Sequence, residues 1–116
     1  MTNEIMVSVA DDIDGGADVI ERGGWVKHSS YTLDGRHCMT GAIHRQVMGS
    51  DNIHAAEATF WKLVGRRDIA IHSLTSFVGV DDVTLWNDAE ERTLQEVLDV
   101  MRACAKDLRR KADEDV

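Results

Sequence analysis

The clearest hydrophobic pattern in the chain lies near its C-terminus and predicts a helix. Apolar residues recur there at intervals of three and four, the spacing of one helical face. They are Leu94, Val97, Leu98, Met101, Ala105 and Leu108. Thr93 with Glu96 forms a capping box, and Asp88 with Glu91 is an earlier alternative. The pattern therefore predicts a helix from Leu94 to Lys111. Its stripe spans only about three heptads, which favours packing inside the domain over a dimer seam.

Residues 4–22 fit two patterns. Ile5, Val7 and Val9 alternate as in a strand, whereas helical spacing holds over a longer window. That window contains Met6, Val9, Ala10, Ile13, Ala17 and Ile20. Gly15–Gly16 would cost roughly 1 kcal/mol per residue inside a helix. We therefore expect a helix that is broken or frayed at Gly15–Gly16, is firm from Ala17 to Arg22, and stops at Gly23–Gly24.

The segment from Trp25 to His37 is irregular, and Asp34–Gly35 is typical of a tight turn. A short hairpin and an ordered loop both fit. A helix is predicted from Cys38 to Met48, with Gly49 as its stop. Its apolar face consists of Met39, Ala42, Ile43 and Val47. Gly41–Ala42 forms a small-residue patch that another element can approach closely.

Two further helices are predicted between residues 50 and 79. Ser50–Asn52 supplies cap candidates for the first, whose stripe is Ile53, Ala56, Phe60, Leu63 and Val64. Gly65–Arg67 separates it from a second helix, which is capped by Asp68 and ends at Gly79. The stripe of the second helix is Ala70, Leu74, Phe77 and Val78. A short apolar run, Val83–Trp86, then leads into Asn87–Asp88.

These patterns predict an all-α domain of four to five helices around one core, with an irregular or hairpin-like segment near residues 25–37. We expect one domain over residues 1–112 and a frayed acidic tail over residues 113–116. The chain contains no proline, which is compatible with a largely helical protein.

Composition narrows the class of protein. The 116 residues are 43% hydrophobic and 29% charged, as in ordinary soluble domains. No apolar run approaches the ~18 residues of a membrane span. The N-terminus lacks the basic flank of a signal peptide, so we expect a cytoplasmic location. The net charge is −8, and the one basic cluster, Arg109–Lys111, is followed by Asp113–Asp115. This distribution argues against direct binding of nucleic acid.

Candidate metal ligands do not converge in the predicted fold. His54 with Glu57, and Asp68 with His72, each share a helical face. Asp68 and His72 nevertheless point away from their apolar stripe, so we predict no metal site and no cofactor.

His37 and His44 lie near Cys38, but this spacing matches no zinc pattern. We expect His37 to be partly exposed at a helix end. Cys38 and Cys104 are expected to be buried free thiols.

Candidate catalytic residues do not form a known motif. No serine lies in a Gly-x-Ser-x-Gly elbow, and no glycine-rich phosphate loop is present. Asn87 and Asp88 could act as a catalytic pair, but the sequence favours a structural role for them. We expect Trp86 to anchor the core, and Asn87 and Asp88 to form the turn that starts the last helix. Trp61 lies off its apolar stripe, and an exposed tryptophan is a candidate anchor for binding.

Several short elements together resemble a family of small proteins of unknown function from actinobacteria and their bacteriophages. The elements are Gly24–Trp25, Asp34–Gly35, Cys38, Gly41–Ala42, Trp86–Asp88, Arg92–Thr93 and Glu96–Val97. The resemblance covers residues 17–105. It implies a small, mostly helical and phage-encoded domain, and it assigns no catalytic residues.

The sequence leads to three hypotheses about function. The first is a non-enzymatic protein-interaction module, such as a phage accessory protein that acts on a host protein. The second is an acidic mimic of nucleic acid that inhibits a DNA-binding protein, for which the 21 acidic residues are the motive. The third is a small enzyme or ligand binder with a pocket near His37, Cys38 and Trp86. A monomer and a homodimer both fit.

Overall fold

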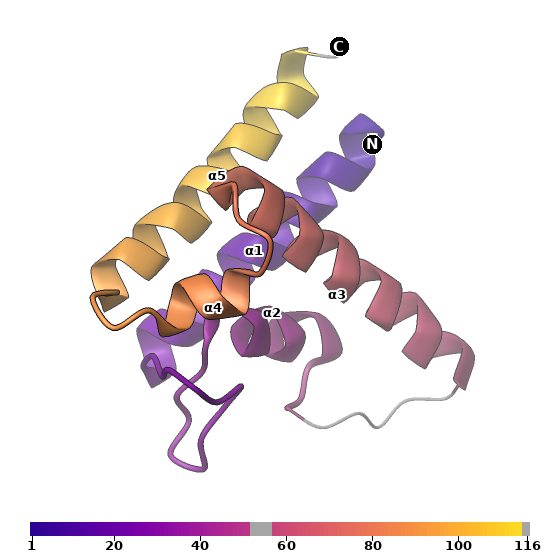
Figure 1. Cartoon of the computed structure of the whole chain (residues 1–116). Helices are drawn as coiled ribbons and strands as arrows, with labels where there is room; N and C mark the ends of the chain where they lie inside the picture. Colours follow the sequence, from indigo (N-terminus) through magenta and orange to yellow (C-terminus); the bar gives the residue numbers. More distant parts are fainter. Residues whose placement is uncertain (52–56, 115–116) are drawn as a thin grey trace.

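The computed structural model describes residues 1–51 and 57–114, and these residues form helices and loops without a β-strand. The helices are α1 (Asn3–Gly23), α2 (Met39–Met48), α3 (Glu57–Val78), α4 (Val83–Asp88) and α5 (Leu94–Glu114). They pack into one globule (Figure 1). The predicted all-α fold class is confirmed.

The helices with the most extensive contact, α1 and α5, are antiparallel, so that the start of α1 and the end of α5 lie close together (Figure 1). The apolar stripe of α5 packs within the domain, as predicted, and its residues Val97, Met101 and Ala105 are fully buried. The capping box is also confirmed. The N–H of Glu96 donates to Thr93 Oγ1 at 3.2 Å, and the N–H of Thr93 donates to Glu96 Oε1 at 3.1 Å.

The prediction that α1 breaks at Gly15–Gly16 is wrong, because the helix is continuous from Asn3 to Gly23. Both α2 and α5 reach α1 at this point. A Cβ atom at Gly16 would lie 3.1 Å from Ile43 Cγ1 of α2 and 3.1 Å from Met101 Cε of α5. The glycine therefore permits close packing of three helices, and this packing offsets its unfavourable helix propensity.

The loop between α1 and α2 is hairpin-like, as one of the two predictions stated. Gly24 ends α1 with φ 102°, and the turn at Asp34–Gly35 is closed by the Thr32 N–H, which donates to the Arg36 carbonyl at 2.9 Å. The chain then enters α2, whose N-cap is Cys38 and whose C-cap is Gly49 in the left-handed conformation.

The small patch at Gly41 is used as the sequence suggested. The carbonyl of Ser30 accepts the Cys38 N–H at 3.1 Å and lies directly over Gly41. A Cβ atom at Gly41 would be 1.9 Å from that carbonyl oxygen. No side chain other than hydrogen fits there without moving the loop away from α2.

The prediction of two helices between residues 50 and 79 is wrong over the described part, since α3 passes unbroken through Gly65. The predicted cap Asp68 lies within this helix and pairs with Arg67. Gly65 has open space around its Cβ position, so it lowers helix stability without interrupting the hydrogen bonds. The helix ends before Gly79 (φ 81°), as predicted.

The stripe of α3 is only partly buried. Ala70 and Leu74 are fully buried, whereas Phe77 is 40% exposed. The predicted stripe and cap residues Asn52, Ile53 and Ala56 lie outside the described residues.

The Val83–Trp86 run and the two residues after it form a short helix, α4, which is capped by Asp82. Asn87 and Asp88 therefore lie in the last turn of a helix, where a turn before α5 was expected. At the C-terminus α5 extends through Glu114, and residues 115–116 lie outside the described part. The proposed division at residue 112 stays a prediction.

Two glycine-to-alanine substitutions test the close approach at α2. Gly41→Ala is expected to lower the free energy of unfolding by about 2 kcal/mol or more, because the methyl group collides with backbone. The control Gly65→Ala, in open space within α3, is expected to raise it by about 0.5–1 kcal/mol. Urea unfolding followed by circular dichroism measures both. Equal effects of the two variants would contradict the packing described at Gly41.

Candidate functional site

Asn87 is the centre of a buried polar cluster that joins α4 to the α1–α2 loop. Its Oδ1 accepts the indole N–H of Trp25 at 2.8 Å and the backbone N–H of Met39 at 3.1 Å. Its Nδ2 donates to the Val26 carbonyl at 3.2 Å and to Asp88 Oδ1 at 2.9 Å. Both amide protons and both oxygen lone pairs are thus used, and the side chain is fully buried.

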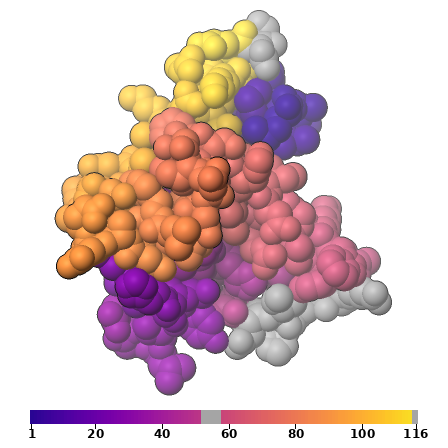
Figure 2. Space-filling view, in the orientation of Figure 1, coloured from indigo at the N-terminus to yellow at the C-terminus, as the bar shows by residue number. Residues whose placement is uncertain are grey.

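Asp88 and Lys27 extend this connection toward the surface. Asp88 Oδ1 also accepts the backbone N–H of His28 at 2.9 Å. Burial alone would raise the pKa of Asp88, but the His28 N–H and the Asn87 amide together outweigh it and lower the pKa. Lys27 Nζ donates to the carbonyls of Ala89 and Glu90, at 2.7 and 2.9 Å, just beyond the end of α4. Figure 2 shows α4 lying on this loop.

The expected roles of the Trp86–Asp88 segment need correction. Asn87 and Asp88 do not start α5; Asn87 instead accepts the N–H of Met39, the first residue of α2. Trp25 is the tryptophan whose indole N–H this segment binds. Trp86 is half-buried and packs against the core, as expected, and the Arg92 guanidinium lies 3.6 Å from its ring centroid. Since every hydrogen-bonding position of Asn87 is used, it has none to offer a substrate.

His37 and Cys38 are also held internally. His37 is buried, contrary to the expectation of partial exposure. Its Nδ1 lies 3.1 Å from the Gly35 carbonyl and its Nε2 lies 2.7 Å from Asp51 Oδ1. Cys38 Sγ accepts the Gly41 N–H at 3.3 Å, which is its contribution as N-cap of α2. The loop folds back over His37 and buries it. The sequence places His37 beside a predicted helix, and this local position does not predict that the loop covers the side chain.

A cavity of about 330 Å³ lies beside His37 and Cys38, between the α1–α2 loop, α2 and α3. It is lined by Ser30, Tyr31, Thr40, Gly41, His44, Asp51, Arg67, Asp68 and Ile71. Its lining includes none of the six residues singled out from the sequence: His37, Cys38, Trp61, Trp86, Asn87 and Asp88. Trp61 lies apart on α3 and is 62% exposed, as expected of a residue off the stripe.

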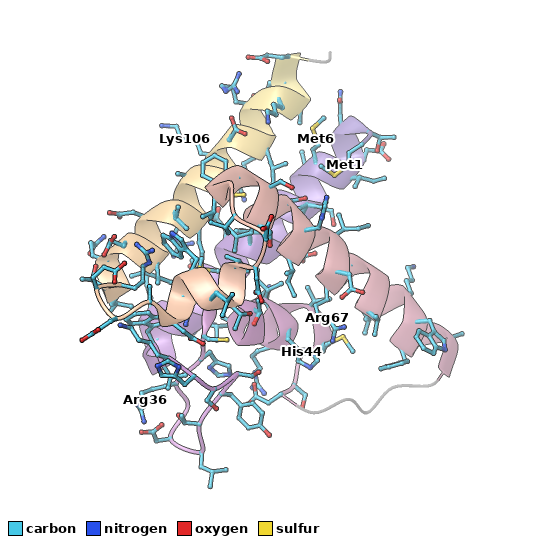
Figure 3. All side chains as sticks on the ribbon, in the orientation of Figure 1. Met1, Met6, Arg36, His44, Arg67 and Lys106 are labelled. Carbon is cyan, nitrogen blue, oxygen red and sulfur yellow. The ribbon has the colours of Figure 1, made fainter. Side chains whose placement is uncertain are left out.

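The sequence singled out His44 only as a possible metal ligand, and it did not single out Arg67. They come from α2 and α3 and face one another (Figure 3). Arg67 Nη1 lies 3.1 Å from His44 Nδ1. The residues are 23 positions apart in the chain, and no local spacing links them; only the packing of α2 against α3 does.

An apolar groove runs along the other side of α3, against the N-terminal half of α1. Ile5 of α1 and Ile69 of α3 line it and are 42% and 43% exposed. Between the helices, the buried Asp12 is paired with Arg66, whose Nη2 donates to Asp12 Oδ1 at 2.7 Å. Toward the end of α3 a neighbouring hollow is lined by Met1 and the half-exposed Phe77.

The acidic face of α1 is largely neutralised by arginines of α5. Arg102 contacts Asp14, Asp18 and Glu21 at 3.1, 2.6 and 3.2 Å. Burial would lower the pKa of Arg102, but the three carboxylates outweigh this and raise it. Arg109 pairs with Asp11 and Asp14 in the same manner. These pairs fix α1 against α5 and leave few free carboxylates on this face.

Metal ligands do not cluster in the described ranges 1–51 and 57–114, where no three His, Cys, Asp or Glu side chains group as a metal site would require. Asp68 and His72 are exposed, as their position off the stripe predicted. His54 lies outside the described residues. Among the described helices, none is both long and apolar enough to cross a membrane.

The family model of DUF6197, a family of unknown function, matches residues 5–107. The chain belongs to this family. The match spans the Asn87 cluster and the cavity of this DUF6197 protein, and it confirms the expected membership of an uncharacterised family. A search among curated proteins found no significant match, and neither did a search among solved structures.

Asn87→Asp tests the central role of the buried amide. The substitution removes the two donors and places a carboxylate against the Val26 carbonyl and Asp88. We expect the free energy of unfolding to fall by about 3 kcal/mol in urea titrations. The same change at Asn3, in the first turn of α1, should leave stability unchanged or slightly higher, because a carboxylate is favourable there. A loss below about 0.5 kcal/mol for Asn87→Asp would refute the role given to this residue.

Both cysteines are predicted to be unreactive in the folded protein. Cys38 and Cys104 are buried free thiols, and burial, together with the charge of Asp107, raises the pKa of Cys104 to about 12. At about pH 8 this group is therefore a thiol, and the thiolate is the reactive form. Mass spectrometry after iodoacetamide treatment should find no rapid labelling in buffer and labelling of both residues in denaturant. Rapid labelling of native Cys104 would contradict its burial.

Proposed function

We propose that this DUF6197 protein is a non-enzymatic module that binds another protein in the groove between α1 and α3. The observation that carries the proposal is the pair Ile5 and Ile69, two branched apolar side chains that are each about two-fifths exposed and flank one groove. Contiguous exposed apolar surface is typical of a protein-binding site. The half-exposed Phe77 and Met1 of the neighbouring hollow lengthen this surface along α3.

The groove suits an amphipathic helix with basic flanks. Its walls are two helices, and a third helix can lay its apolar face between them. The net charge of the protein is −8, so lysine or arginine on the flanks of the partner helix would speed association. Arg66 is held by Asp12 and would not repel such a partner strongly.

The acidic-mimic hypothesis is less well supported. A mimic of nucleic acid needs a continuous face of unpaired negative charge. On α1, five of the carboxylates are instead paired with Arg66, Arg102 or Arg109. These are Asp11, Asp12, Asp14, Asp18 and Glu21.

The resemblance to proteins of actinobacteria and their bacteriophages supports a host protein as the partner. An accessory protein of this kind would act in the host cytoplasm by covering an amphipathic helix of the host protein. We propose further that the protein is encoded by a phage and acts in the cytoplasm of the host. A monomer and a homodimer would both leave the groove available to the partner.

A comparative pull-down from actinobacterial lysate tests the proposed function. Wild-type protein, Ile69→Asp and the control Leu33→Asp are used as baits, since Leu33 is fully exposed in the α1–α2 loop. We expect a protein that is retained by wild type and Leu33→Asp but not by Ile69→Asp. For the isolated partner, burial of a charge at a central apolar contact should weaken binding by about 2 kcal/mol, or roughly thirtyfold.

Two results would count against this function. One is repeated failure of the wild-type bait to retain any protein above background. The other is equal retention by wild type and Ile69→Asp, which would place the contact elsewhere on the molecule.

A further inference from the structure

We propose that the cavity between the α1–α2 loop, α2 and α3 binds a small zwitterion of the free α-amino acid type, with its carboxylate on Arg67 and His44. This site lies on the opposite flank of α3 from the protein-binding groove and does not depend on it. The argument rests on which hydrogen-bonding groups line the cavity and on which of their protons are already used.

His44 presents one unused donor. Arginine is always a donor, so the 3.1 Å contact from Arg67 Nη1 makes His44 Nδ1 the acceptor and places the ring proton on Nε2. Nε2 is buried, and within the described ranges it has no hydrogen-bond partner. Burial lowers the pKa of His44, and the charge of Arg67 lowers it further, so the ring is neutral at physiological pH. A buried N–H without an acceptor is costly, which favours a bound group with an oxygen.

Arg67 adds two more donors to the same cavity. Its Nε and Nη2 each donate to Asp68 Oδ1 at 3.1 Å, and its Nη1 donates to His44. A guanidinium carries five N–H groups, so one proton on Nη1 and one on Nη2 are left over. One proton on each terminal nitrogen is enough to contact the two oxygens of a carboxylate.

The cavity also contains negative charge, which narrows the ligand class. Asp51 and Asp68 line it together with Arg67. Oδ1 of Asp51 contacts His37 and Oδ1 of Asp68 contacts Arg67, so an ammonium group would meet the other oxygen of each carboxylate. Two carboxylates would repel a dianion such as phosphate, whereas they favour a ligand with its own ammonium group. A molecule that carries one carboxylate and one ammonium satisfies both sets of charges.

The remaining lining and the size of the cavity fit a single amino acid. Tyr31 and Ile71 offer an aromatic and an aliphatic surface for an apolar side chain. The volume of about 330 Å³ is at the lower end of the ~300–1,000 Å³ range of ligand pockets. We therefore expect a preference for amino acids with apolar side chains.

Calorimetric titration of the full chain tests the ligand class. The probes are L-phenylalanine and L-leucine, with phenethylamine, which lacks the carboxylate, and hydrocinnamate, which lacks the amine. We expect saturable binding of at least one amino acid at millimolar or lower concentration, and binding of both analogues weaker by about tenfold or more. Absence of binding by both amino acids overturns the proposal, and equally tight binding of either analogue overturns the zwitterion class.

Variants of the lining residues test the location. Arg67→Gln and His44→Phe should each weaken amino-acid binding by about tenfold or more, because each removes a donor to the carboxylate. Arg45→Gln is the matched control, an exposed arginine on α2 outside the cavity lining. Thermal unfolding confirms that each variant is folded. Unchanged affinity in folded Arg67→Gln, or an equal loss in Arg45→Gln, overturns the assignment.

Discussion

The structure depends most on the buried amide of Asn87, which links segments far apart in the chain. One side chain satisfies the indole of Trp25, the first N–H of α2 and a carbonyl of the α1–α2 loop. An apolar residue of the same size would leave all three groups without these partners, in a buried or partly buried position. These hydrogen bonds hold the loop in one position on the domain, and the cavity wall formed by Ser30 and Tyr31 depends on that position.

The second constraint is the close approach of helices at glycine. At Gly16, α1 is contacted by both α2 and α5, and at Gly41 the loop carbonyl of Ser30 lies on α2. These two contacts set how closely α2 lies to α1, to α5 and to the loop, and they thereby help to place His44 on α2. The two proposed binding surfaces lie on opposite flanks of α3, so the proposed ligand and the proposed protein partner would occupy separate places on this chain.

The sequence predicted those elements whose signals are local. The capping box at Thr93, the left-handed stop at Gly49 and the apolar stripe of α5 each follow from residues within one or two helical turns. The errors occurred where local propensity and tertiary packing disagree. Gly15–Gly16 predicts a helix break, but two other helices pack against this point and keep the helix continuous. The position of His37 predicts partial exposure, but the loop covers the side chain. Gly65 differs, because an exposed glycine weakens a long helix without ending it.

By itself the sequence determined the all-α class, the ends of α2, the start of α5, the buried thiols and the resemblance to an uncharacterised family. These follow from periodicity, capping chemistry and short motifs, which act over a few residues. Only the tertiary structure decided that Asn87 serves Trp25 and α2, that His44 meets Arg67, and that Ile5 and Ile69 flank a groove. Such contacts join residues from different helices, and their geometry depends on how those helices pack, which no local pattern encodes.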